Sequence, residues 1–218
     1  MKLELYTNSL SPFARMIELQ LAMKQLEYER HQPDRDFVRD GAFGDINPLR
    51  KVPTLVVDGK ACPETQVIFD LVEDLWPTPS LLPADPAARS QVRLLTRIAD
   101  IYLATPAVAL INVLTREPSA DRESDARAMI QRGFRALERW LDGGDYAAGG
   151  QRSIADCALA PSLFAIDHVL PALGGKDLPR PGEKVVSLYA ALKRDELIGA
   201  VLKEMETQLA ERLSPAAQ

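Results

Sequence analysis

The most informative segment of the chain reads Asn47-Pro48-Leu49-Arg50-Lys51-Val52-Pro53-Thr54-Leu55-Val56-Val57-Asp58-Gly59. Residues 54–57 are apolar and mostly β-branched and precede Asp58-Gly59, a pattern that predicts a buried strand and a tight hairpin turn. The proline before this strand has no N–H to donate to a sheet. Proline is also the residue that adopts a cis peptide at modest cost. We therefore expect a cis Val52-Pro53 bond, which would leave the main-chain N–H and C=O of Val52 free for an extended ligand.

A helix start follows the hairpin within a few residues. Glu64-Thr65 precedes residues 66–75, which have the apolar spacing of a helix. The free backbone N–H groups and the dipole at a helix N-terminus attract a carboxylate. Together with the exposed main chain of Val52, this helix start predicts a binding site for a small anionic peptide.

The first part of the chain alternates between strand and helix patterns. Ser11-Pro12 has the residues of a helix start, with serine as the N-cap and proline at the first helical position. The strand, helix and strand that come first should form a right-handed parallel crossover. The predicted order is strand, helix, strand, short helix, hairpin and helix, over residues 2–7, 12–24, 26–31, 34–44, 54–62 and 66–75.

Prolines 77, 79, 83 and 86 then mark a linker, and no strand pattern follows it. The sequence beyond predicts helices over residues 87–116 (bent near Pro106), 121–141, 153–170, 183–194 and 196–213. We therefore expect an α/β domain over residues 1–77, a linker over 78–88 and an all-helical domain over 89–218.

Composition excludes several classes of function. The net charge of −5 disfavours an electrostatic hold on nucleic acid or on an anionic membrane. We expect no apolar run that approaches the roughly 20 residues of a membrane helix. The charged N-terminus does not resemble a signal peptide, so a cytoplasmic protein is predicted. The two cysteines, Cys62 and Cys157, lie far apart and indicate neither a disulfide scaffold nor a metal site.

The motifs, taken in order, resemble those of the cytosolic glutathione transferases over essentially the whole chain. They are Leu5-Tyr6, Ser11-Pro12-Phe13-Ala14-Arg15, Asn47-Pro48, Lys51-Val52-Pro53-Thr54-Leu55, Pro63-Glu64-Thr65 and Ser153-Ile154-Ala155-Asp156. The resemblance implies a thioredoxin-like first domain, an all-helical second domain, glutathione as co-substrate and a homodimer.

The resemblance also implies roles for individual residues. Val52 would pair its main chain with the cysteinyl part of glutathione, and Pro53 would be the cis-proline. Glu64 and Thr65 would hold the γ-glutamyl end, and Lys51 would neutralise the glycyl carboxylate. The alternative interpretation is that Glu64 and Thr65 only start a helix and that Lys51 is merely solvated.

Catalysis with glutathione requires stabilisation of its thiolate, because a free thiol with a pKa of about 8.5 is mostly protonated at neutral pH. Ser11 is the first candidate, at a helix N-terminus whose dipole also favours an anion. Ser9 is the main rival, Tyr6 is third, and Ser11 could instead be only a helix cap. Ser11 stands where omega-like relatives have cysteine, so thiol–disulfide exchange through this residue is excluded.

The predicted function is transfer of glutathione to an electrophilic, apolar small molecule. Two alternatives remain open at this point. One is a non-catalytic protein of the same fold that acts as a binding or interaction module, and the other is a glutathione-dependent peroxidase, which needs no thiol of its own.

Overall fold

The computed structural model describes residues 1–214, apart from the side chains of residues 35, 39 and 40. The chain divides into two compact units, residues 1–80 and the residues from Leu81 onward. The first is α/β, and the second, as far as it is described, is helical. Thus the predicted fold class, a small α/β domain followed by an all-helical domain, is confirmed.

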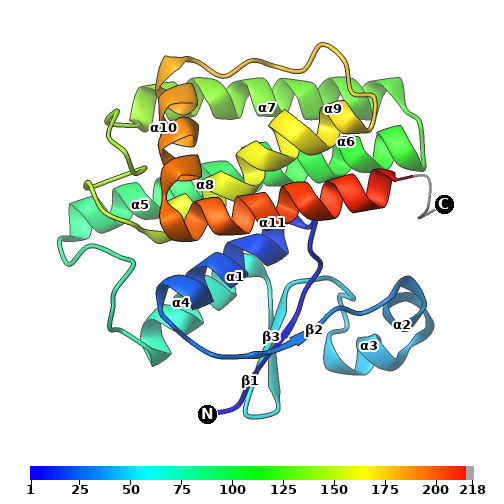
Figure 1. The fold of residues 1–218 in the computed structure, drawn as a ribbon, viewed down its shortest axis with the longest axis vertical. Coiled ribbons are helices and arrows are strands. Elements are labelled where there is room, and N and C mark those ends of the chain that lie inside the picture. Colours follow the sequence, from blue (N-terminus) through cyan, green and yellow to red (C-terminus); the bar gives the residue numbers. More distant parts are fainter. Residues whose placement is uncertain (215–218) are drawn as a thin grey trace. The chain divides into compact units, whose positions relative to one another are not determined.

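The first unit is a four-stranded mixed sheet with helices on both faces (Figure 1). The strand order is β2-β1-β3-β4; β1 pairs with β2 in parallel and with β3 antiparallel, and β3 and β4 form the predicted hairpin. The elements in chain order are β1 (Leu3–Tyr6), α1 (Pro12–Met23), β2 (Glu29–His31), α2 (Arg35–Asp40), α3 (Ala42–Ile46), β3 (Thr54–Val57), β4 (Lys60–Pro63) and α4 (Thr65–Leu75).

Two details of this unit differ from the sequence prediction. The second strand is shorter than residues 26–31, and it begins only where β1 offers a partner, at Glu29. The irregular segment 34–44 forms two short helices instead of one. Gly41 separates them with a φ of 133°, a conformation that side chains rarely adopt.

Alternation along β1 directs neighbouring side chains to opposite faces of the sheet. Leu5 is completely buried, as are Ile17 of α1 and Ile68 of α4, and these two helices pack against each other. Tyr6 lies on the other face, where its ring centroid is 5.3 Å from that of Phe43 in α3. Helices α1 and α4 therefore pack on one face of β1, and α3 packs on the other.

A buried lysine fastens the chain that leaves α4. The Lys24 ammonium donates to the carbonyls of Trp76 and Pro79, both at 2.7 Å, and lies 2.9 Å from the Glu73 carboxylate. These partners satisfy a charge that would otherwise be costly to bury. They also tie residues 76–79 to the first unit, where a linker was predicted to begin.

The second unit consists of helices joined by loops (Figure 1). Its elements are α5 (Pro86–Ile98), η1 (Ala99–Ala104), α6 (Thr105–Thr115), α7 (Ala120–Trp140), α8 (Ile154–Phe164), η2 (Ala165–Val169), α9 (Leu170–Ala172), α10 (Glu183–Arg194) and α11 (Glu196–Leu213). α5 begins at Pro86, inside the predicted linker, because the Asp85 carboxylate caps it at the Ala88 N–H.

The two long predicted helices, 87–116 and 153–170, each contain a π-helical segment, η1 and η2. Both segments end two residues before a proline, Pro106 or Pro171. The N–H of Thr105 donates to Asp100, five residues earlier, and that of Leu170 donates to Ala165. A proline clashes with the carbonyl four residues before it, and a wider turn relieves that clash. The predicted bend near Pro106 is therefore a local widening of the helix.

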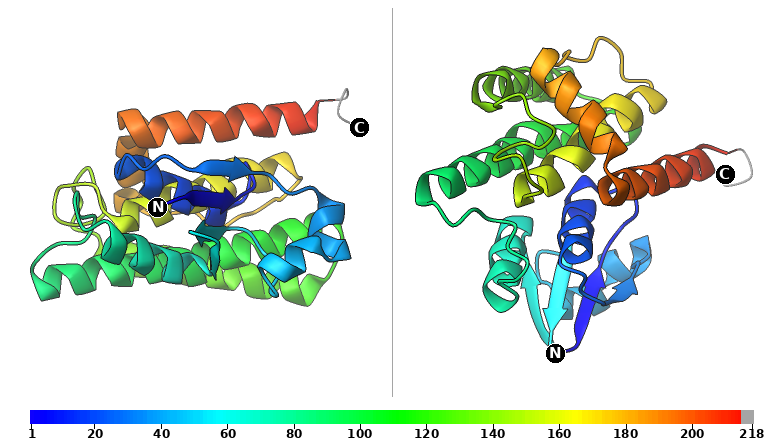
Figure 2. Two further views of the ribbon diagram at one scale, coloured as in Figure 1. Left: turned by 90° about the horizontal axis from the view of Figure 1, so that it is seen from below. Right: turned by 60° about the vertical axis from the view of Figure 1, so that its left-hand side comes forward.

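Helix α8 lies at the centre of the second unit, where it contacts α5, η1, α10 and α11 (Figure 2). A capping box lies at its start. The Asp156 carboxylate accepts the N–H and the hydroxyl of Ser153, at 2.8 and 2.9 Å, and the N–H of Ala147 at 2.7 Å. Cys157 is completely buried.

Among the described residues, two helical runs are long and apolar enough to cross a membrane: Pro86–Thr115, which is 30 residues long, and Ile154–Ala172. This contradicts the expectation that no run approaches that length. Both runs correspond to helices predicted from the sequence, and charged residues such as Asp100 and Asp156 interrupt them without making them polar on average. In Ile154–Ala172, 83% of the apolar window is buried inside the protein, as in the core helix of a globular domain.

Candidate active site

The sheet register brings the predicted site segments to one end of the sheet. Tyr6, the last residue of β1, pairs with Thr54, the first residue of β3, and Thr54 pairs with Pro63, the last residue of β4. Neighbouring strands lie about 4.8 Å apart. The loop after Tyr6, the residues before Thr54 and the helix start after Pro63 therefore leave the sheet within about two strand spacings of one another.

Ser11 is the N-cap of α1, as predicted. Its Oγ accepts a hydrogen bond from the N–H of Ala14 at 3.3 Å, and Pro12 follows at the first helical position. Within residues 1–214, the Ser11 hydroxyl donates its own proton to no other residue. Capping uses only a lone pair of the oxygen, so the O–H remains available to an anion placed beside the helix N-terminus.

Ser9 has a different environment. Its side chain is buried, with 6% of the residue exposed, and its hydroxyl donates to Gln32 Oε1 at 3.2 Å. The Arg30 guanidinium donates to the same hydroxyl oxygen at 3.4 Å. Ser9 is thus occupied by contacts within the protein, whereas Ser11 has a free donor.

A buried ion network holds the loop that carries both serines. Arg15, with 1% exposure, donates through Nε to the Ser9 carbonyl at 2.9 Å and forms an ion pair with Glu18. Glu18 also accepts from Thr7 Oγ1 at 2.6 Å and from Arg30 Nε at 3.1 Å. The network therefore connects the end of β1, the loop, α1 and β2.

The sequence prediction did not include this network. Arg15 and Glu18 are three residues apart, the ordinary spacing of a surface ion pair on a helix. Two charged residues within an otherwise apolar helix face were the only signal that they are buried. Arg30 and Thr7 belong to other segments, so their part in the network depends on the fold.

Tyr6, the third candidate, is packed between aromatic rings. Its ring stacks on that of His31 at 4.8 Å and lies near Phe43. Burial raises the pKa of the Tyr6 hydroxyl, and the charges of Glu4 and Glu29 raise it further. Tyr6 therefore stays protonated and has the surroundings of a packing residue.

The cis Val52-Pro53 peptide predicted from the sequence is present. Within the described residues, neither main-chain polar group of Val52 has a hydrogen-bond partner. The preceding turn is fixed instead by Asn47, whose side-chain N–H donates to the Lys51 carbonyl at 3.0 Å and to Thr54 Oγ1 at 2.9 Å. The Lys51 side chain is exposed. An extended ligand could therefore pair with Val52 while a cation stands nearby.

Glu64 has a φ of 72°, which is uncommon for a residue with a side chain. Such a conformation costs on the order of 1–3 kcal/mol and is concentrated at binding sites. Glu64 occupies the N-cap position of α4, yet its exposed side chain makes no capping hydrogen bond. Thr65, the first helical residue, is buried. The exposed carboxylate and the helix N-terminus can thus face a ligand that carries both an ammonium and a carboxylate.

A second cluster of ionisable groups lies on the edge of the sheet. The ligand-type atoms of Glu4, Glu29 and His31 fall within 4.8 Å of one another, a spacing that a metal ion could bridge. The Lys2 ammonium, however, lies 2.9 Å from Glu4 and 3.2 Å from Glu29. It supplies the positive charge that a metal would bring, so the cluster is an ion network of the sheet edge.

Comparison with known proteins identifies the family. The glutathione S-transferase N-terminal domain matches residues 10–75, and the glutathione S-transferase C-terminal domain matches residues 112–194. Maleylacetoacetate isomerase of Rattus norvegicus is 30% identical, over 73% of this chain and 76% of its own. The chain belongs to the glutathione S-transferase family. It is a glutathione-dependent enzyme, with glutathione as its co-substrate.

Solved structures of the family have the same fold. Glutathione transferase Omega 3C from Trametes versicolor is 29% identical with a TM-score of 0.73, and the match covers 94% of this chain and 89% of that one. Maleylacetoacetate isomerase from Anaeromyxobacter dehalogenans is 25% identical with a TM-score of 0.71, covering 100% of this chain and 94% of that one. Neither comparison tests the roles of individual residues, which remain predictions.

Proposed function

We propose that this glutathione transferase uses the Ser11 hydroxyl to stabilise the thiolate of glutathione, which then attacks an electrophilic carbon of an apolar small molecule. One observation supports the choice of Ser11. Its oxygen caps α1 at the Ala14 N–H while its proton has no acceptor within the described residues. Ser9, by contrast, already donates to Gln32.

The size of the effect follows from general hydrogen-bond energies. A hydrogen bond to an ionised group contributes about 1.5–3 kcal/mol. Since one pKa unit corresponds to about 1.4 kcal/mol, Ser11 could lower the pKa of the bound thiol by about one to two units. That brings a thiol of ordinary pKa about 8.5 close to neutrality, where much of it is thiolate.

The rest of glutathione is placed by the groups around Ser11. Val52 offers the cysteinyl main chain an N–H and a C=O that have no hydrogen-bond partner within the described residues, and the Lys51 ammonium is available to the glycyl carboxylate. The Glu64 carboxylate pairs with the γ-glutamyl ammonium. The N-terminus of α4, at Thr65, receives the γ-glutamyl carboxylate, which the helix dipole stabilises.

A second activity, cis–trans isomerisation of a conjugated enoyl acid, is favoured by the likeness to two maleylacetoacetate isomerases. The same thiolate would add to the double bond, the resulting single bond would rotate, and elimination would return the thiolate. Glutathione is regenerated in this reaction, whereas conjugation consumes it. The two activities need the same Ser11 and differ only in the second substrate.

We also propose, from the family resemblance, that the protein is a cytoplasmic homodimer with a role in detoxification. Light scattering of the purified protein at micromolar concentration tests the assembly. A particle of only 24.0 kDa, the mass of one chain, would contradict it.

The central test measures turnover of glutathione with an aryl halide, and with a maleyl-type enoyl acid, for wild type, Ser11→Ala and Ser9→Ala. We expect Ser11→Ala to lower kcat/KM by about 10- to 100-fold, as loss of one to two pKa units implies. The apparent pKa of the bound thiol, followed by thiolate absorbance, should rise by the same amount. Equal turnover in Ser11→Ala and wild type would refute the proposed role. Glutathione consumption distinguishes conjugation from isomerisation.

A further inference from the structure

The loop between α3 and β3, residues 47–53, carries main-chain groups that are proposed to bind glutathione. Its first residue, Asn47, is 1% exposed. The amide nitrogen of Asn47 donates to the Lys51 carbonyl at 3.0 Å and to Thr54 Oγ1 at 2.9 Å. The amide oxygen accepts the N–H of Leu49 at 2.9 Å. A single buried side chain therefore joins residues two, four and seven positions further along the chain.

Thr54 holds the same loop from the side of the sheet. It is completely buried, and it pairs with Tyr6 of β1 as the first residue of β3, so strand pairing fixes its position. Its hydroxyl donates to the Lys51 carbonyl at 2.9 Å, while its oxygen accepts from Asn47. The Lys51 carbonyl thus receives two hydrogen bonds, one from each buried side chain. We call Asn47 and Thr54 the loop clamp.

The Lys51 carbonyl and the Val52 N–H belong to one peptide group. That peptide is trans, because within the described residues only Val52-Pro53 and Thr78-Pro79 are cis. A trans peptide is planar, so its C=O and N–H point in opposite directions. Holding the Lys51 carbonyl toward the loop clamp therefore turns the Val52 N–H away from it. Two buried side chains thus set the direction of a donor that is proposed to bind glutathione.

The residue before Lys51 is held in a strained conformation. Arg50 has a φ of 52°, which residues with a side chain seldom adopt. Its N–H donates to the Asn47 carbonyl at 2.8 Å, which closes a tight turn. Conformations of this kind persist where surrounding contacts impose them. The loop clamp supplies such contacts on both sides of Arg50, at Leu49 and at Lys51.

We propose that Asn47 and Thr54 are positioning residues for glutathione, because they orient the Val52 N–H toward the cysteinyl carbonyl of the tripeptide. This inference rests on the proposed function, in which the Val52 main chain pairs with the cysteinyl residue. In an antiparallel ladder, two paired residues exchange one N–H···O=C bond in each direction. Glutathione paired in this way accepts the Val52 N–H at its cysteinyl carbonyl and donates its cysteinyl N–H to the Val52 carbonyl. The loop clamp acts on the first of these bonds.

The experiment measures binding of two thiol compounds to the full-length protein by titration calorimetry. Glutathione has the cysteinyl carbonyl, whereas N-(γ-glutamyl)cysteamine lacks that carbonyl and the glycine but keeps the amide N–H. Thr54→Val removes the hydroxyl donor, and Thr54→Ser keeps it. We expect Thr54→Val to weaken glutathione binding by about fivefold, the worth of one hydrogen bond, and Thr54→Ser to bind as wild type does. Binding of N-(γ-glutamyl)cysteamine should change by less than about twofold, because it has no acceptor for the affected donor.

Asn47→Asp gives a second, larger perturbation of the same carbonyl. Its carboxylate can still accept the Leu49 N–H, but it has no N–H for the Lys51 carbonyl and would accept the Thr54 hydroxyl itself. The Lys51 carbonyl then loses both donors, so glutathione binding should weaken by about 10-fold or more. Either variant alone tests the inference if the other does not fold.

Turnover separates positioning from catalysis. In Thr54→Val the KM for glutathione should rise by about fivefold, while kcat at saturating glutathione stays at the wild-type value, because binding is weakened without a change at Ser11. The pKa of the bound thiol should be unchanged for the same reason. The matched control is Thr96→Val in α5, which removes a buried hydroxyl that donates to the Val92 carbonyl at 2.8 Å. This control should leave glutathione binding and turnover unchanged.

Two outcomes would overturn the inference alone. One is glutathione binding in Thr54→Val and Asn47→Asp that equals wild type. The other is an equal loss of affinity for glutathione and N-(γ-glutamyl)cysteamine, which would indicate general disruption of the loop. The thiolate role of Ser11 is tested separately, because full turnover in Ser11→Ala would refute that role and leave these binding ratios unaffected. Absence of glutathione binding in wild type would refute the proposed function and this inference together.

Discussion

Ser11 is proposed to perform two tasks with one hydroxyl, and substitutions can separate them. Its oxygen accepts the Ala14 N–H and so caps α1, and its proton is offered to the thiolate. Ser11→Ala removes both functions. Ser11→Asp keeps an oxygen acceptor for the cap but supplies no proton and adds a negative charge. Ser11→Thr keeps both.

The expected changes in stability follow from the cap. Loss of a serine N-cap costs about 1 kcal/mol, within a range of about 0.5–2 kcal/mol. For a chain of this length that corresponds to a decrease in melting temperature of about 2–4 °C per kcal/mol. Ser11→Ala should show this decrease, whereas Ser11→Asp should melt near the wild-type temperature, because an acid at an N-cap also interacts favourably with the helix dipole.

The expected changes in activity depend on loss of the hydrogen bond that the Ser11 hydroxyl donates to the thiolate. Both Ser11→Ala and Ser11→Asp should raise the pKa of bound glutathione by about one to two units, and Ser11→Asp by the larger amount, because its carboxylate repels the thiolate. Turnover should therefore fall most near pH 6.5 and recover as the pH approaches the ordinary thiol pKa of about 8.5, where glutathione ionises unaided.

The assay combines thermal melts of the free enzyme with pH profiles of kcat/KM for glutathione and an aryl halide. Ser11→Thr is the control and should resemble wild type in both. Full activity in Ser11→Asp would refute the argument, because no proton would then be needed at this position. A loss in Ser11→Ala that is equal at every pH would also refute it, since such a loss indicates misplacement of the substrate.

Three further predictions concern the structure around and beyond the site. Glu18→Gln leaves the buried Arg15 guanidinium without its ion pair and should destabilise the protein by about 3–5 kcal/mol, measured by urea unfolding; a loss under about 1 kcal/mol would show that the pair is solvated. Gly133→Ala would place a Cβ 2.8 Å from Leu103 Cδ2, so we expect the free energy of unfolding to fall by about 1–2 kcal/mol and the melting temperature to fall with it. A variant more stable than wild type would contradict this packing. Burial raises the pKa of Asp156 from 3.8 to about 6, so folding favours the protonated carboxyl. The contribution of Asp156 to stability is therefore fully present below pH 3.8 and is lost as the pH rises through about 6. The difference in unfolding free energy between wild type and Asp156→Asn should therefore decrease from pH 5 to about pH 7.5, and a difference that grows with pH would have the wrong sign.

Local signals in the sequence were sufficient for most of the secondary structure. Helices Glu183–Arg194 and Glu196–Leu213 have the predicted bounds, and Ser11 caps α1 as predicted. These features depend on side chains within one turn of each other, so the sequence contains them directly. The cis Val52-Pro53 peptide could be inferred for the same reason, from a proline placed directly before a buried strand.

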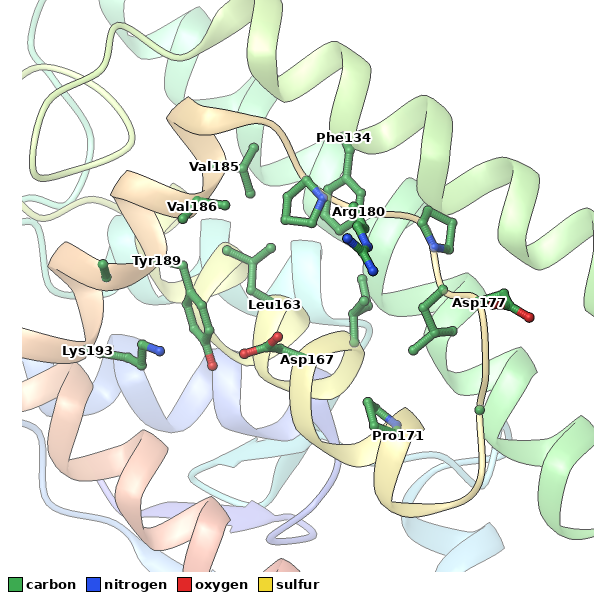
Figure 3. Close-up of a pocket in the computed structure, with 16 residues that line it drawn as sticks. Phe134, Leu163, Asp167, Pro171, Asp177, Arg180, Val185, Val186, Tyr189 and Lys193 are labelled. Carbon is green, nitrogen blue, oxygen red and sulfur yellow. The ribbon is translucent and has the colours of Figure 1, made fainter.

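Only the tertiary structure shows how the surroundings of Ser9 and Ser11 differ. The two serines lie in one loop, and the sequence ranked Ser11 first without excluding Ser9, but Arg30 and Gln32, more than twenty residues away, bind the Ser9 hydroxyl. The pairing of Tyr6 with Thr54, which places both near the proposed glutathione site, likewise depends on strand register. A cavity of about 490 Å³ in the helical unit also depends on the fold, because its walls come from α7, the α8–η2–α9 run, α10 and the segment between α9 and α10 (Figure 3). Contacts between distant segments exist only when the chain is folded, and for that reason a reading of local patterns could not supply them.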